Sequence, residues 1–138
     1  MSGYHVITKH KGKMAFVAEI GHHKVLMDSV PDNDGDDSGP SPKKLLLATL
    51  ATCTGMDIVS LLKKMRVEYS DFEIVTDAGL TEEHPKVFSN IEVLYRIKLD
   101  EKDREKFEKA VSLSQHKYCG ISAILRKSSP LDYRIEYV

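Results

Sequence analysis

The sequence has few cysteines, no excess of charge of either sign, and no apolar stretch at its start. Charged residues make up 30% of the 138 residues, yet the formal net charge is −1. This balance gives no electrostatic basis for binding nucleic acid or a membrane surface, so neither partner is expected. The first ten residues lack the apolar region of a secretory signal, which predicts a cytoplasmic protein. In a reducing cytosol, the two cysteines favour free thiols or a working redox pair over a structural disulfide.

The length predicts one domain over residues 1–138, long enough to bury a core without stabilising disulfides or metal ions. One apolar stretch, Leu45 to Leu62, could be mistaken for a membrane span. It carries a carboxylate, Asp57, whose insertion into a bilayer costs about 2.5–3.5 kcal/mol even on lenient scales. A core helix is the better interpretation.

Periodicity predicts the elements of an α+β domain in the order βββ-α-ββ-α-α-β. Alternating residues in the first thirty positions indicate three short strands in an antiparallel meander. Ser41 is a good N-cap and Pro42 suits a first helical position, so a helix is expected from there to about Met65. Its apolar residues cover nearly the whole circumference, which predicts burial on several sides. The later elements are expected near residues 72–76 and 87–99 (strands), after Asp100 and after Cys119 (helices), and at 131–137 (a closing strand).

Two patterns resemble metal sites without completing one. Asp32, Asp34 and Asp36 are spaced like the start of a calcium loop, but Lys43 stands where that loop needs a bidentate glutamate. His116 and Cys119 have an i, i+3 spacing, but no second Cys–His pair accompanies them. No metal and no cofactor are expected.

The two cysteines can be explained either as core packing or as a reactive dithiol. Cys53 falls inside the apolar helix, where burial raises the pKa of a thiol. Asp57 lies one turn later on the same face and would raise that pKa further, so a reactive Cys53 needs a cation from elsewhere in the fold. Cys119 precedes a short helix, whose backbone N–H groups favour a thiolate.

Three segments together resemble a known family. Gly39–Pro42 leads into Leu45–Thr54, which holds Cys53, and Tyr118–Ala123 holds Cys119. His84–Phe88 precedes a long alternating strand. In their order along the chain the segments are similar to the OsmC/Ohr superfamily of bacterial stress proteins, and the resemblance spans nearly the whole chain.

The resemblance implies an OsmC-like fold with antiparallel sheets around a long buried central helix, in an intertwined homodimer. It implies a thiol peroxidase that reduces organic hydroperoxides, with Cys53 as the peroxidatic and Cys119 as the resolving cysteine. A sulfenic acid forms on the first thiol and condenses with the second. A lipoyl-type dithiol is the reductant that the family implies.

The chain departs from the family's active pattern at two positions. Lys43 stands where active members have a glutamate, and no arginine precedes Arg66 to pair with the thiolate. Lys11 and Lys13 are the candidate cations, although lysine replaces a rigid arginine fork only in part. Lys43 lies ten positions before Cys53, about 15 Å along a helix axis, so any role for it is expected in the partner subunit's site.

These departures keep two alternatives open. One is a non-catalytic protein that binds a small apolar or thiol-reactive ligand in the interface pocket of the same fold. The other is a structural or stress-response protein whose cysteines serve packing alone. A cation close to the Cys53 sulfur would favour the peroxidase, whereas an apolar pocket without one would favour the binding protein.

Overall fold

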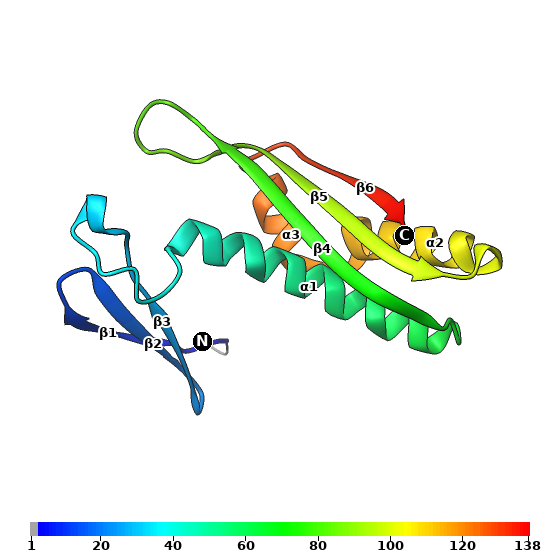
Figure 1. Ribbon diagram of the computed structural model, residues 1–138, viewed down its shortest axis with the longest axis horizontal. Helices are drawn as coiled ribbons and strands as arrows, with labels where there is room; N and C mark the ends of the chain where they lie inside the picture. The colour runs from blue at the N-terminus through cyan, green and yellow to red at the C-terminus, as the bar shows by residue number, and fades with distance from the viewer. Residues whose placement is uncertain (1–2) are drawn as a thin grey trace. The chain divides into compact units, whose positions relative to one another are not determined.

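The computed structural model describes residues 3–138, and the chain divides into two compact units between Leu46 and Leu47 (Figure 1). The first unit is a three-stranded sheet with a long loop. The second contains both cysteines and most of the secondary structure. A single domain over residues 1–138 stays a prediction.

The first unit is the predicted antiparallel meander. Strands β1 (Ile7–Gly12), β2 (Ala15–Ile20) and β3 (His23–Met27) pair in sequence order. After β3 the chain forms a loop around the Asp28 carboxylate, which is buried. That carboxylate accepts hydrogen bonds from the backbone of Ser29, Asp36 and Ser38 and from the Ser38 hydroxyl. The acidic loop is therefore organised by one buried carboxylate.

The second unit contains a mixed sheet in the order β4-β5-β6. Strands β4 (Tyr69–Leu80) and β5 (Phe88–Leu99) are antiparallel, but β6 (Leu131–Tyr137) pairs parallel to β5. The expectation of antiparallel sheets throughout was wrong here. The chain between β5 and β6 is a long helical crossover, which parallel neighbours require and a hairpin cannot provide.

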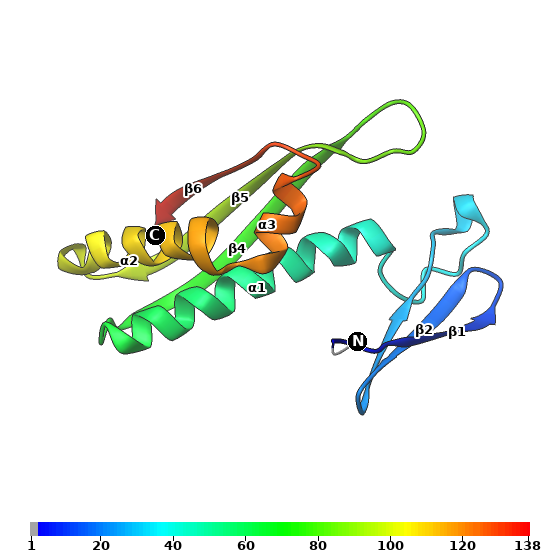
Figure 2. The same ribbon diagram turned by 180° about the vertical axis from the view of Figure 1, so that it is seen from behind.

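The crossover follows the predicted order with two additions. Asp100 caps a 3-10 turn, η2 (Glu101–Asp103), rather than the helix α2 (Arg104–Leu113) itself. A π-helical turn, η3 (Ser114–Tyr118), then leads into α3 (Gly120–Arg126). Helices α1, α2 and α3 lie on one face of the sheet (Figures 1 and 2). The core between them includes Leu50, Ile58, Ile91, Val93, Tyr95, Ile97, Phe107 and Val111.

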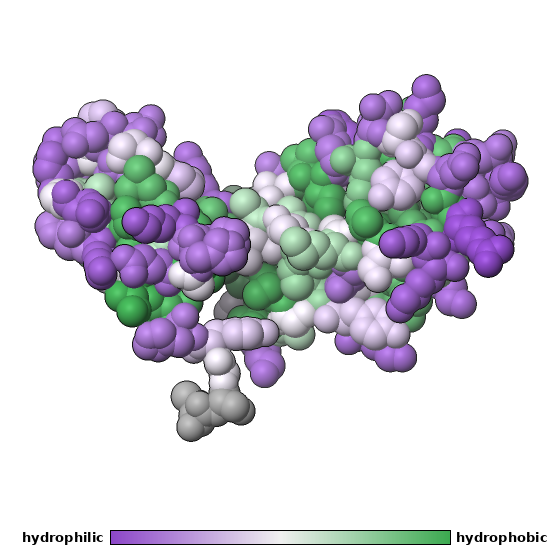
Figure 3. All heavy atoms as spheres, turned by 90° about the horizontal axis from the view of Figure 1, so that it is seen from below, coloured by the Kyte–Doolittle hydropathy of each residue, from purple (hydrophilic) through white to green (hydrophobic). Residues whose placement is uncertain are grey.

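Helix α1 (Pro42–Lys64) has the predicted boundaries, whereas its burial on several sides stays a prediction. Only one stripe is buried, at Leu50, Thr54, Ile58 and Leu62, because the other elements cover α1 on one side within the chain. Elsewhere on α1, Met56 is 69% exposed. Apolar surface is visible on the molecule in Figure 3. By length and composition α1 could cross a membrane. Its polar stripe residue Thr54 hydrogen-bonds inside the unit, as in a core helix.

Candidate dithiol site

The second unit brings the two predicted cysteines together. Cys53, in the middle of α1, is half-buried and packs against the core. Cys119 is 4% exposed and lies between η3 and α3. Cys119 lies close enough to Cys53 to contribute to the raised pKa of the Cys53 thiol, and both cysteines are free thiols. The fold therefore places a dithiol pair at the point where α1 meets the start of α3.

The first turn of α3 places backbone N–H groups beside the two cysteines. Cys119 is the N-cap of this helix, with extended backbone angles, and its Sγ accepts from Ser122 N–H at 3.4 Å. The backbone N–H of Ile121, in the same turn, favours the Cys53 thiolate and so lowers the pKa of that thiol. N-terminal N–H groups have no partner within their own helix, so the Cys119 sulfur takes the place of the usual capping oxygen.

Burial is the main reason why the pKa of Cys53 is raised above its ordinary value. The hydrogen bond and charge of Cys119 and the charge of Asp57 raise this pKa further, whereas the Ile121 N–H lowers it. The charge of Asp57 therefore acts on the Cys53 thiol in the direction expected from the sequence. None of the groups that dominate this shift is a lysine or arginine.

The π-helical turn η3 sets the position of Cys119. The backbone N–H of Cys119 donates to the carbonyl of Ser114, five residues earlier, at 2.8 Å. This wide turn was not predicted from the sequence. Single π turns inside helices occur frequently at functional sites.

A buried network of hydroxyl groups lies beside the thiols. Thr54 Oγ1 lies 2.7 Å from both Tyr95 Oη and Ser114 Oγ, and all three side chains are fully buried. Ser114 Oγ donates to Asp57 Oδ2 at 3.0 Å, and Gln115 Nε2 donates to Tyr95 Oη at 2.5 Å. The network thus starts at the residue after Cys53 and ends in the turn before Cys119.

Arg126 closes the network from the last turn of α3. Its guanidinium donates to the Gln115 carbonyl and, at 2.8 Å, to Gln115 Oε1. The sequence analysis did not identify Arg126, Gln115, Tyr95, Thr54 or Ser114 as site residues. Their signal in the sequence is a polar group at a position where the periodicity requires an apolar one, because buried polar groups need hydrogen-bond partners.

The three predicted lysines lie in the first unit or at the start of α1. Lys11 is exposed in β1, and Lys43 is exposed in the first turn of α1. Lys13 forms an ion pair with Asp36 at 2.7 Å, and this hydrogen bond together with the charge of Asp36 raises its pKa. Lys13 therefore has a carboxylate partner in its own unit. Pairing of any of these lysines with Cys53 stays a prediction.

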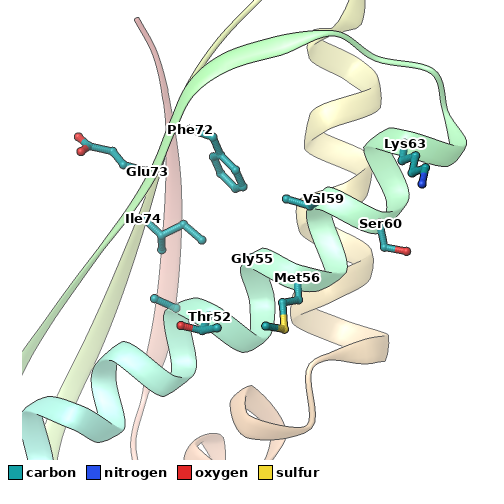
Figure 4. A pocket seen from close by; sticks show the side chains of 10 residues that line it. Thr52, Gly55, Met56, Val59, Ser60, Lys63, Phe72, Glu73 and Ile74 are labelled. Carbon is teal, nitrogen blue, oxygen red and sulfur yellow. The ribbon is translucent and has the colours of Figure 1, made fainter.

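An apolar groove runs along α1 and is lined on its other side by β4 (Figure 4). Its volume is about 650 Å³, and Met56, Val59, Phe72 and Ile74 contribute apolar walls. Lys63 and Glu73 also line it. The groove has the composition of a site for an apolar molecule or an apolar partner surface.

The fold and the dithiol agree with the comparisons with known proteins. The sequence model of the OsmC-like protein family matches residues 35–134, so the chain belongs to the OsmC family. Protein YhfA of Escherichia coli (strain K12) is 31% identical over 116 residues, which is 84% of each chain.

Two solved structures show the same fold. A hypothetical protein from Aquifex aeolicus VF5 superposes with a TM-score of 0.81 at 27% identity, over 100% of this chain and 99% of that one. The organic hydroperoxide resistance protein OhrB of Bacillus subtilis superposes with a TM-score of 0.65 at 20% identity, over 98% of both chains.

Proposed function

We propose that this protein is a two-cysteine thiol peroxidase for organic hydroperoxides. The observation that carries this proposal is that the fold brings Cys53 and Cys119, which lie far apart in the sequence, close enough for their thiols to interact. The OsmC family includes structural neighbours described as organic hydroperoxide resistance proteins. Two adjacent free thiols beside the first turn of α3 are the minimum that a dithiol reaction needs.

The reaction has two steps within the protein. The Cys53 thiolate attacks the distal peroxide oxygen, the O–O bond breaks, and the organic alkoxide takes a proton to leave as an alcohol. Cys53 becomes a sulfenic acid. Cys119 then attacks the Cys53 sulfur, a disulfide forms, and the sulfenic hydroxyl leaves as water. An external dithiol of the lipoyl type restores both thiols by exchange.

The experiment is to mix the reduced protein with cumene hydroperoxide and follow disulfide formation and peroxide loss. Cys53→Ser should abolish the reaction, whereas Cys119→Ser should consume one equivalent and accumulate a sulfenic acid that dimedone traps. Oxidation no faster than that of free cysteine would contradict the proposal.

A second candidate function is binding of a small apolar ligand in the groove between α1 and β4. The groove supports it, as does the raised pKa of Cys53, which leaves little thiolate at neutral pH. Binding of a fluorescent fatty-acid probe, lost in Val59→Glu but retained in Cys53→Ser, would favour this function. Absence of binding would leave the peroxidase as the better candidate.

We also propose the homodimer that the family resemblance implies. Met56 and Val59 on α1 are exposed in the single chain, and a partner subunit would cover such residues. Light scattering coupled to size exclusion should give twice the chain mass of 15.6 kDa. A monomeric mass would contradict the dimer.

A further inference from the structure

The hydroxyl network next to the thiols has a single direction of hydrogen bonding. Ser114 has one hydroxyl proton, and the carboxylate of Asp57 at 3.0 Å is a stronger acceptor than the Thr54 carbonyl at 3.4 Å. Since Ser114 donates to Asp57, it accepts from Thr54. Thr54 in turn has no second proton, so it accepts from Tyr95.

The same direction continues to the other end of the network. Because the Tyr95 hydroxyl donates its hydrogen bond to Thr54, it accepts a hydrogen bond from the amide nitrogen of Gln115. The Gln115 amide oxygen accepts from Arg126. Every donor therefore has one acceptor, from the Arg126 cation to the Asp57 carboxylate, and charged groups at both ends strengthen such a chain.

This chain connects the two cysteine-bearing segments at one contact. Thr54 directly follows Cys53 in α1, and its hydroxyl contacts that of Ser114 at 2.7 Å. The carbonyl of the same Ser114 accepts the backbone N–H of Cys119 at 2.8 Å. Ser114 thus holds α1 with its side chain and Cys119 with its main chain.

We propose that Thr54, Tyr95 and Ser114 are positioning residues that hold the Cys119 thiol against Cys53. By fixing the approach of the two sulfurs, they set the effective concentration of one thiol toward the other and so the reduction potential of the Cys53–Cys119 disulfide. The inference deepens the proposed function and rests on its dithiol. It concerns disulfide formation alone, which can be measured without any hydroperoxide.

In glutathione buffers the electrons balance as follows. The Cys53 thiolate attacks one sulfur of oxidised glutathione and releases one glutathione thiolate. The Cys119 thiolate then attacks Cys53 in the mixed disulfide and releases the second. The two protein thiols lose two electrons and two protons, and one glutathione disulfide becomes two thiols. The equilibrium constant of this exchange measures the effective concentration.

The experiment equilibrates the reduced full-length protein in glutathione buffers without oxygen and counts protein disulfides by alkylation and mass spectrometry. Thr54→Val removes the hydroxyl at nearly constant volume, and Thr54→Ser keeps it. Tyr95→Phe removes the same hydrogen bond from its other partner. Thr52→Val is the matched control, because Thr52 directly precedes Cys53 in the sequence. Its hydroxyl donates to the Ala48 carbonyl within the same helix.

We expect Thr54→Val and Tyr95→Phe to lower the equilibrium constant about three- to tenfold, with Thr54→Ser and Thr52→Val within about twofold of the parent. A loss of fold stability alone would not move this constant. If Thr54→Val does not fold, Tyr95→Phe decides.

Three results would overturn the inference. These are folded variants with an unchanged constant, a Thr54→Ser effect as large as that of Thr54→Val, and a parent protein that never forms the Cys53–Cys119 disulfide. If the constants shift as expected but hydroperoxide is not consumed, the peroxidase proposal fails and the positioning role stands.

Discussion

Asp57 lies one turn after Cys53 on α1, and its charge helps to raise the pKa of the Cys53 thiol. The same carboxylate accepts the hydrogen bond of Ser114 that anchors the hydroxyl chain. One side chain therefore opposes formation of the thiolate while stabilising the network beside it. These two effects can be separated, because one depends on charge and the other on a hydrogen-bond acceptor.

Asp57→Asn should lower the pKa of Cys53, because it removes the negative charge while keeping an oxygen for Ser114. The rate of alkylation by iodoacetamide at pH 7 should therefore rise a fewfold in a Cys119→Ser background. The measurement is a pH series of alkylation rates from pH 6 to pH 10. Lys63→Ala, on an exposed part of the same helix, is the control. An unchanged profile would show that Asp57 does not act on the thiol.

Asp28 should make the protein sensitive to acid. Its hydrogen bonds with Ser38 and Ser29 lower the pKa of this carboxyl from 3.8 to about 2. A lowered folded-state pKa gives stability that is present above the unfolded value and is lost as the pH falls through about 2.

The urea midpoint of the parent should therefore fall between pH 4 and pH 2, and that of Asp28→Asn should change less over this range. Asp32→Asn, on an exposed residue of the same loop, should behave like the parent. Parallel acid profiles for the parent and Asp28→Asn would contradict the role of this carboxylate.

Gly35→Ala should disrupt the loop around Asp28. A Cβ at Gly35 would collide with the backbone of Ser29, including its carbonyl oxygen. Because backbone atoms cannot move aside like a flexible side chain, we expect a loss of about 1–3 kcal/mol, as in overpacked sites. Limited proteolysis should cut the loop faster, and the unfolding midpoint should fall.

Gly120→Ala is the control for that substitution. A Cβ at Gly120 meets no atom within 4 Å, and the residue opens α3, where alanine is favourable. Its unfolding midpoint should equal or exceed that of the parent. Equal stability of Gly35→Ala and the parent would contradict the steric argument.

Tyr137 should contribute stability that disappears in alkali. Burial raises the pKa of its phenol to about 12, as do its hydrogen bond to Glu108 and the charge of that residue. A raised folded-state pKa gives stability that is complete below the unfolded value near 10 and is lost as the pH rises through about 12.

The parent should therefore lose more stability than Tyr137→Phe between pH 10 and pH 12, as measured by urea midpoints. Tyr118→Phe, on an exposed tyrosine, controls for the general effect of alkali. An equal loss of stability in alkali for the parent and for Tyr137→Phe would contradict the raised pKa of Tyr137.

The sequence alone determined where most helices and strands lie and which two residues are the candidate reactive thiols. Alternation and capping located the meander, α1 and the closing strand, because those signals depend on local geometry. The parallel pairing of β6 could not be read from its own residues, since it depends on how the crossover returns to the sheet. The burial of α1 on one side only likewise depends on which elements cover it.

Only the tertiary structure decided what surrounds the two thiols. The contact between Thr54 and Ser114 joins residues 60 positions apart, and no local pattern encodes such a pair. The sequence supplied two cysteines and a set of polar residues at core positions. Folding gave those residues their partners, because a buried hydroxyl or carboxylate is stable only where another element brings a donor or acceptor to it.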